Sequence, residues 1–154
     1  KGLTAGYLTM SAVLTTRAVA DTISRGEAGV LMHGPTFMAN PLACAIAIES
    51  AKMLRENDMK AVVGNIESIL KEELAQASAI PGVADVRVLG SIGVVEMKRP
   101  VDVDRFQVEC VRQGVWIRPF GKNVYLMPPY VITSESLRTL CRRMLAIIRD
   151  EKNY

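Results

Sequence analysis

The chain has 154 residues, of which 49% are apolar and 23% are charged, and its formal net charge is +3. These proportions are those of an ordinary globular protein and exclude a disordered chain, which would carry far less Val, Ile, Leu and Met. No run of about 18 or more apolar residues is present, so we expect no membrane span, and the amino terminus lacks the zones of a signal peptide. Nor does the mild positive charge indicate nucleic-acid binding, because Glu135, Asp150 and Glu151 are interspersed among the basic residues near the carboxyl terminus.

The cysteines indicate a reducing compartment and no metal site. Cys44, Cys110 and Cys141 are odd in number, lack a C-x-x-C spacing, and each lies in an apolar helical pattern. We therefore expect them to fill the core of a cytoplasmic protein. His33, the single histidine, has no acidic partner and no second ligand nearby in the sequence, so we expect a structural role in a loop.

In chain order, residues 1–39 come first and show no long helical period. Only residues 15–24 have the pattern of a helix, and it is short. The glycines and short apolar stretches around it do not provide a core. We therefore expect this segment to pack against a larger body of protein.

A helix is predicted next, over residues 40–55. Asn40 is a good N-cap, and Pro41 suits the first helical position because no helical N–H bond is lost there. Its sequence, Leu-Ala-Cys-Ala-Ile-Ala-Ile after the proline, is apolar nearly all round. Such a helix is expected to be buried on several sides, between layers or domains.

The remaining residues alternate helices and strands. The patterns predict a helix over residues 58–77, a hairpin of strands 83–89 and 92–97 around Gly90 and Ser91, and a short helix that starts at Asp102 or Asp104 and ends at Gly114. A second hairpin of strands 115–118 and 124–126 follows, and then a final helix that begins after Thr133 or Ser134. This order predicts an α+β sandwich, with helices covering an antiparallel or mixed sheet.

Taken singly, the polar candidates are ambiguous. Thr36 lies in a Gly-Pro-Thr turn ahead of a helix, where its hydroxyl and the backbone N–H groups suit an anion such as phosphate. Physics alone favours the alternative, that Thr36 helps to cap the entry to the helix. Arg118, which Pro119 holds extended beside Trp116, suits a carboxylate clamp or, more simply, a surface ion pair. Tyr125 either lines a pocket or merely closes the sheet.

Lys1 precedes a turn of small residues, Gly-Leu-Thr-Ala-Gly, that lets a bulky cofactor approach closely. A desolvated lysine in such a place is able to form a Schiff base with a carbonyl group.

Three stretches together resemble the class III, pyridoxal-phosphate-dependent aminotransferases of fold type I. They are residues 1–7, residues 33–41 (His-Gly-Pro-Thr-Phe-Met-Ala-Asn-Pro), and residues 114–130, which include Trp-Ile-Arg-Pro-Phe-Gly-Lys and Tyr-Leu-Met-Pro-Pro-Tyr. The first is typical of the whole class. The second and third resemble the branch that acts in biotin biosynthesis.

The resemblance covers essentially the whole chain and implies the carboxyl-terminal portion of an α/β protein. Residues 1–40 would be a remnant of the large cofactor-binding domain, 41–57 an interdomain helix, and 58–154 an α+β small domain. Everything upstream of Lys1 in the family is missing here, including the glycine- and serine-rich phosphate loop, the aromatic group that stacks on the pyridine ring, and the Asp that pairs with the ring nitrogen. We therefore expect these residues alone neither to bind pyridoxal 5′-phosphate tightly nor to turn over.

The resemblance also assigns roles residue by residue. Lys1 matches the catalytic lysine that forms the Schiff base and moves the proton. Thr36, with Pro35 beside it, matches the residue that binds the cofactor phosphate of the neighbouring subunit, and Gly34 lies by the substrate channel. Arg118 matches the arginine that holds the keto-acid carboxylate, and Tyr125 matches a tyrosine near it.

The implied enzyme is a homodimer that converts 8-amino-7-oxononanoate to 7,8-diaminononanoate with S-adenosylmethionine as amino donor. No nucleic acid or membrane partner is expected. Two alternatives stay open, a non-catalytic α+β ligand-binding or interaction module, and a class III aminotransferase with a different acceptor.

Overall fold

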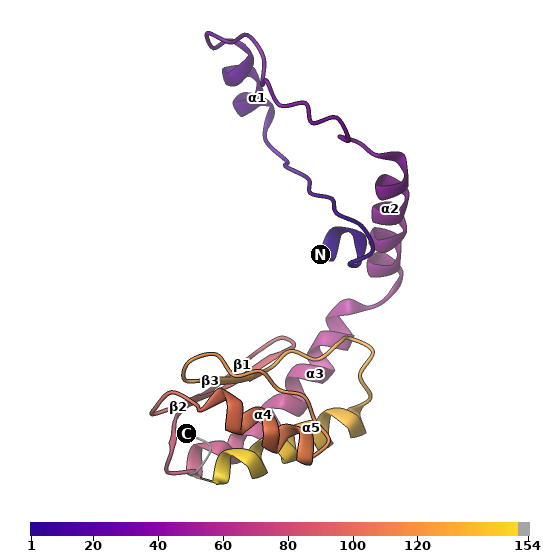
Figure 1. Ribbon diagram of the computed structural model, residues 1–154. Helices are drawn as coiled ribbons and strands as arrows, with labels where there is room; N and C mark the ends of the chain where they lie inside the picture. The colour runs from indigo at the N-terminus through magenta and orange to yellow at the C-terminus, as the bar shows by residue number, and fades with distance from the viewer. Residues whose placement is uncertain (151–154) are drawn as a thin grey trace. The chain divides into compact units, whose positions relative to one another are not determined.

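The computed structural model describes residues 1–150, and the chain divides into two units (Figure 1). Unit 1 is Lys1–Asp58, and unit 2 is Met59–Tyr154. The last four residues of the expected small domain, 151–154, lie outside the described residues. No helix among residues 1–150 combines the length and the apolar content needed to cross a membrane.

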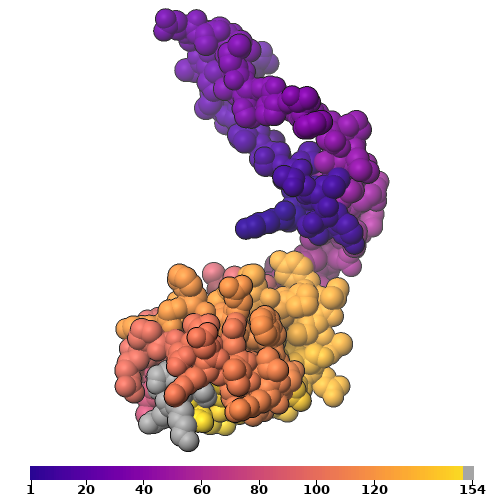
Figure 2. Space-filling model, viewed as in Figure 1, coloured from indigo at the N-terminus to yellow at the C-terminus, as the bar shows by residue number. Residues whose placement is uncertain are grey.

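Unit 1 contains the short 3₁₀ helix η1 (Gly2–Thr4) and the helices α1 (Arg17–Ser24) and α2 (Pro41–Glu56). Helix α1 begins two residues later than expected, because the Thr16 side chain accepts a hydrogen bond from Val19 N and so occupies the N-cap. Non-helical arms lead to α1 and away from it, and open space separates them over part of their length (Figures 1 and 2).

The expectation that α2 is buried on several sides supposed further protein around it, and residues 1–58 alone leave most of the helix exposed. Only Ala43 of this helix is buried, and the large apolar side chains Leu42, Ile48, Met53 and Leu54 are at least half exposed. The N-cap is as predicted, because Asn40 Oδ1 accepts a hydrogen bond from Ala43 N at 3.1 Å. The helix therefore forms where its local sequence dictates, while residues 1–58 supply too little apolar surface to cover it.

Unit 2 packs three helices with one small sheet. Its elements are α3 (Met59–Leu74), the 3₁₀ helix η2 (Ala75–Ala79), β1 (Val83–Leu89), β2 (Ile92–Met97), α4 (Val103–Arg112), β3 (Asn123–Leu126) and α5 (Ser134–Arg149). The predicted helix over 58–77 thus ends earlier, at Leu74, and tightens into η2. As expected, Asp102 caps α4, and the Thr133 side chain caps α5 by accepting from Ser136 N.

The sheet is antiparallel, with the order β1-β2-β3. The first predicted hairpin is confirmed, and Gly90 at its turn has a φ of +56°, which glycine adopts without strain. Gly93 faces the helices, and a Cβ there would lie 2.7 Å from Leu74 Cδ1. The two glycines therefore serve a turn and a close helix–sheet contact.

The second predicted hairpin is wrong, since residues 115–118 form no strand. Strand β3 pairs with β2 and not with this segment, although β3 lies at the edge of the sheet. Pro119 also lacks an N–H to donate. Only Phe120 bridges to Asn123 across the turn between them.

The core of unit 2 lies between the helices and one face of the sheet. Alternate residues of the strands face inward, and the predicted apolar stripe of α5 is confirmed, with only Leu140 half-buried. The fully buried side chains include Leu70, Val95, Met97, Phe106, Val124, Leu137, Met144 and Ile148. Burial of this apolar surface supplies most of the stability of the unit.

A buried carboxylate joins α3 to α5. Glu73 is 6% exposed, and its carboxylate accepts hydrogen bonds from Arg138 Nη1 at 2.8 Å and from Arg142 Nε at 3.2 Å. Burial raises the pKa of Glu73, but the hydrogen bonds from the two arginines outweigh it and hold that pKa below its ordinary value. The ionised carboxylate therefore stabilises the packing of α3 on α5.

We expect Glu73→Gln to lower the free energy of unfolding of unit 2 by about 1–3 kcal/mol, because it leaves two arginines without their shared charged partner. Urea unfolding followed by circular dichroism measures this. Glu72→Gln is the matched control, because the Glu72 side chain is 63% exposed and an exposed pair contributes less, about 0–1 kcal/mol.

The pH dependence of the free energy of unfolding tests the role of Glu73 in a second way. Because the folded-state pKa of Glu73 is lowered, its contribution is fully present above the reference value of 4.5 and is lost as the pH falls below it. The difference between the wild-type chain and Glu73→Gln should therefore shrink in acid. An equal difference at pH 7 and at pH 3 would contradict the assignment.

Thiol labelling should separate Cys44 from the other two cysteines. Cys44 is half-buried, whereas Cys110 and Cys141 are fully buried, and burial raises the pKa of both, that of Cys141 to about 12. Since the thiolate is the reactive form, we expect a disulfide reagent to label Cys44 in the folded chain and the others only after unfolding. Equal rates at all three positions would contradict the described core.

Candidate active site

The turn that carries Lys1 is held by its own backbone. The carbonyl oxygen of Lys1 accepts hydrogen bonds from Thr4 N at 3.3 Å and from Gly6 N at 2.9 Å. Thr4 is fully buried, and its hydroxyl donates to the carbonyl oxygen of Leu8. The Lys1 side chain is exposed and makes no hydrogen bond or ion pair with residues 2–150. The backbone hydrogen bonds therefore fix the turn, and they leave the Lys1 side chain exposed.

The second candidate segment is also a turn. Met38 N donates to the carbonyl oxygen of Pro35 at 2.9 Å, which places Thr36 at an exposed central position of the turn. Asn40, and not Thr36, caps α2. Because the Thr36 hydroxyl has no partner among the described residues, the capping role that competed with phosphate binding has no support in the structure.

A hollow of about 550 Å³ lies beside this turn. Its lining comes from the arm before α1, from the turn itself and from the start of α2, and it includes His33, Pro35, Phe37 and Ala43. Pro35 lines this hollow, and its neighbours Gly34 and Thr36 are exposed in the same stretch without lining it. Lys1 lies on a separate turn of the same unit.

Arg118 belongs to unit 2 and lies in the extended segment 115–119. Ile117 is 2% exposed whereas Trp116 is 67% exposed, so the predicted alternation of side chains holds although no strand forms. Arg118 points outward with Trp116, and its guanidinium makes no hydrogen bond or ion pair with any other residue in the range 1–150. A surface ion pair, the simpler of the two sequence interpretations, is therefore absent among these residues.

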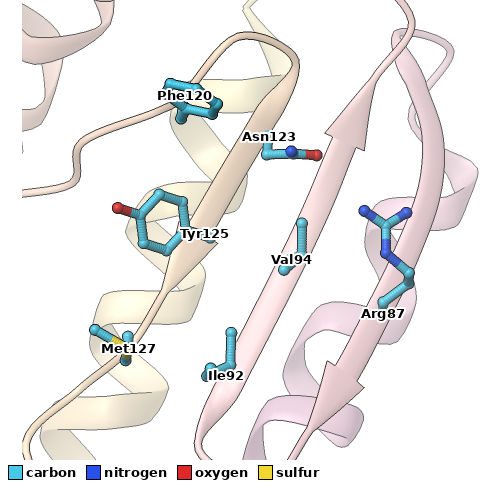
Figure 3. Close-up of a pocket in the computed structure, with 7 residues that line it drawn as sticks. All are labelled: Arg87, Ile92, Val94, Phe120, Asn123, Tyr125 and Met127. Carbon is cyan, nitrogen blue, oxygen red and sulfur yellow. The ribbon is translucent and has the colours of Figure 1, made fainter. Parts of the chain in front are cut away.

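Tyr125 lies on the face of the sheet opposite the helices (Figure 3). It lines a shallow hollow of about 360 Å³ together with Arg87, Ile92, Val94, Phe120, Asn123 and Met127. The tyrosine is 37% exposed, so it forms a wall of this hollow in addition to its place in the sheet. Arg118 does not line the hollow, although Phe120, two residues later in the chain, does.

Sequence reasoning missed the neighbours of Tyr125, namely Arg87, Asn123 and Phe120. They come from two separate stretches, β1 and residues 120–123, and the pairing of Val94 with both Arg87 and Tyr125 brings these stretches together. The alternation within each strand was visible, but the register between strands was not. No group of three or more His, Cys, Asp or Glu side chains placed to hold a metal ion occurs within residues 1–150.

Comparison with known proteins gives these residues a context. The sequence model of the family described as "Aminotransferase class-III" matches residues 1–148, across both units. The chain is 49% identical over 140 residues to adenosylmethionine-8-amino-7-oxononanoate aminotransferase of Buchnera aphidicola subsp. Acyrthosiphon pisum, a match that covers 91% of this chain and 33% of that enzyme. It is 45% identical over 152 residues to the enzyme of the same name from Corynebacterium glutamicum, covering 98% of this chain and 36% of that one.

The fold has the same relatives. The crystal structure of adenosylmethionine-8-amino-7-oxononanoate aminotransferase from Methanocaldococcus jannaschii is 29% identical and superimposes with a TM-score of 0.79 over 97% of this chain and 37% of that one. The predicted assignment to fold type I, in its carboxyl-terminal portion, is thereby confirmed. The chain spans about a third of the length of the curated relatives it matches.

Proposed function

This chain belongs to the class III aminotransferases, and from that premise we propose that it forms the carboxyl-terminal third of an enzyme that aminates 8-amino-7-oxononanoate to 7,8-diaminononanoate. The amino donor in this proposal is S-adenosylmethionine, in line with the names of the relatives. One observation carries the proposal. The amine, the hydroxyl and the guanidinium that such a reaction requires, on Lys1, Thr36 and Arg118, are all exposed and without partners among residues 1–150.

Class III aminotransferases depend on pyridoxal phosphate, and the donor groups of unit 1 fit part of that cofactor. A primary amine is the group that attaches to the aldehyde, and a hydroxyl in a backbone turn suits the phosphate. Lys1 and Thr36 provide these two groups, and neither is committed to a structural contact. Thr36 would hold the phosphate of the neighbouring subunit, with Pro35 fixing the turn.

When bound, pyridoxal phosphate withdraws electrons from the carbon that carries the substrate amine and so stabilises negative charge there. The chain's own part is proton transfer and orientation. Nζ of Lys1 would take the proton from that carbon and deliver it to the cofactor carbon that carries the aldehyde in the free cofactor. The backbone hydrogen bonds of its turn hold the lysine in place during both transfers.

Recognition of the acceptor falls to unit 2. The Arg118 guanidinium presents two parallel N–H donors, which match the two oxygens of a carboxylate. Because Arg118 has no ion pair to break within the described residues, binding a carboxylate there costs little reorganisation. Tyr125 would line the acceptor side of the site, and Gly34 the approach to it.

The assembly and the compartment follow from the same proposal. Aminotransferase substrates are small molecules. A cofactor phosphate held by Thr36 of the neighbouring subunit requires a homodimer. Three free thiols, none of them in a disulfide, suit a cytoplasmic enzyme. The alternative of a separate non-catalytic module loses its basis, because the family match spans both units rather than unit 2 alone.

We expect Lys1→Ala in the complete polypeptide to lower kcat by about 10²–10⁴-fold, since it removes the group that moves the proton. Steady-state assays with 8-amino-7-oxononanoate measure this. Lys52→Ala is the matched control, because Lys52 also lies in unit 1 but is engaged with Glu49 at 2.6 Å. Equal losses in the two variants would rule out a catalytic role for Lys1.

We expect Arg118→Ala to raise the KM for the keto-acid acceptor by about 10–100-fold, because a charge-assisted hydrogen-bonded pair contributes about 1.5–3 kcal/mol. The KM for the amino donor should change little. Arg112→Ala serves as control, since Arg112 is exposed on α4 and pairs with Glu109 at 3.5 Å. A KM that rises for the donor instead of the acceptor would contradict the assignment.

A further inference from the structure

The segment that carries Arg118 has little backbone support of its own. Residues 116–119 take part in no backbone–backbone hydrogen bond within the described part of the chain. Just downstream, Phe120 and Asn123 exchange two backbone hydrogen bonds of 2.9 Å each, which tie that end of the segment to β3. The position of Arg118 therefore also depends on what holds the upstream end.

The upstream end is tied to α4. Val115 N donates a hydrogen bond to the carbonyl oxygen of Cys110 at 2.9 Å. Burial raises the pKa of the Cys110 thiol, and a hydrogen bond from the backbone N–H of Ile117 to this side chain partly offsets the rise. Ile117 itself belongs to the core of unit 2. A displacement of the end of α4 would therefore also displace the segment that carries Arg118.

A second helix, α5, holds the same end of the segment. Nη1 of Arg143 donates to the carbonyl oxygen of Gln113 at 2.6 Å and to that of Gly114 at 3.3 Å. Gln113 is the C-cap of α4, and the end of a helix leaves carbonyl groups unpaired and favours a cation. The contact is so close that a Cβ on Gly114 would lie 3.0 Å from Nη1. Arg143 thus links α5 to the two residues at which the chain leaves α4.

Side-chain packing does not replace this link. A hollow of about 380 Å³ is lined by Gly114 and Val115 and, from α5, by Thr139 and Arg143 among others. Close packing resists displacement elsewhere in the core, but a hollow offers little steric resistance. The hydrogen bonds of Arg143 are therefore the contact that fixes Gly114 relative to this part of α5.

We propose that Arg143 is a positioning residue for acceptor binding. By holding the carbonyl groups of Gln113 and Gly114, it fixes the start of the segment that presents Arg118 to the carboxylate. This inference rests on the proposed function, because Arg143 acts only through Arg118. A guanidinium that is held less firmly binds a carboxylate less well, since two parallel hydrogen bonds require one orientation. The effect concerns the acceptor and not the proton transfer by Lys1.

Steady-state kinetics of the complete enzyme test the proposal. We expect Arg143→Ala to raise the KM for the keto-acid acceptor by about 3–10-fold, less than Arg118→Ala does, because the guanidinium that binds the carboxylate is still present. The KM for the amino donor and kcat should stay unchanged. Arg143→Lys should restore part of the acceptor KM, since an ammonium group still donates to a carbonyl. Arg149→Ala is the matched control, because Arg149 also lies on α5 but donates to Gln76 Oε1 at 2.9 Å.

The double variant, Arg118→Ala with Arg143→Ala, shows whether Arg143 acts through Arg118. If it does, Arg143→Ala changes the acceptor KM little once Arg118 is removed, because residues that act as a unit are not additive. Equal factors in both backgrounds would overturn the inference, and so would an unchanged acceptor KM in Arg143→Ala alone. An unchanged acceptor KM in Arg118→Ala would contradict the proposed acceptor site and this inference with it, so the two failures are distinguishable.

The fluorescence of Trp116, the single tryptophan of this chain, gives a readout that does not depend on activity. Trp116 lies two residues before Arg118 and is 67% exposed, so nanosecond motion of the segment lowers its fluorescence anisotropy. We expect a lower anisotropy in Arg143→Ala, a partial return in Arg143→Lys, and no change in Arg149→Ala. An unchanged anisotropy in Arg143→Ala, or an equal fall in Arg143→Ala and Arg149→Ala, would overturn the inference.

Discussion

Residues 1–58 carry more apolar surface than they are able to bury, and this constraint separates unit 1 from unit 2. Helix α2 forms because Asn40 caps it and Pro41 fits its first turn, yet Leu42, Ile48 and Met53 stay exposed along it. Unit 2 meets the opposite condition, since α3, α5 and the sheet close around one core. Apolar surface left open on a folded helix or sheet normally marks an interface. Leu42, Ile48 and Met53 on α2, and Leu89 and Met127 of unit 2, are apolar side chains exposed in this way.

The same division runs through the proposed chemistry. The groups for the cofactor, Lys1 and Thr36, belong to unit 1, whereas the groups for the acceptor, Arg118 and Tyr125, belong to unit 2. Local backbone structure alone holds the residues Lys1 and Thr36 in position. Lys1 lies in a turn that backbone hydrogen bonds hold, and Thr36 lies in the turn closed by the hydrogen bond from Met38 N to Pro35 O. Arg118 lies in an extended segment whose neighbouring residue, Ile117, is buried. The local geometry of the two proposed cofactor groups therefore forms without contacts to distant residues.

Local patterns predicted most of the elements, and the failures share one cause. The caps at Asn40, Asp102 and Thr133 follow from side chains that bond to neighbouring backbone, and the hairpin at Gly90 follows from alternation around a glycine. The strand at 115–118 was wrong because pairing with another strand decides whether a strand forms, and local alternation does not show that β3 pairs with β2 alone. The burial of α2 stays a prediction, because no cover for this helix lies within residues 1–58. For the site, family resemblance selected Thr36 and Arg118 where single-residue physics favoured a cap and an ion pair, and the structure shows neither of those contacts.

The most direct test of the account is the site of covalent attachment of pyridoxal phosphate in the complete enzyme. Borohydride reduction would make the link permanent, and peptide mass spectrometry would then locate it. The account predicts the phosphopyridoxyl group on Nζ of Lys1. A label on another lysine, such as Lys52, or cofactor-saturated enzyme with no labelled lysine, would contradict it.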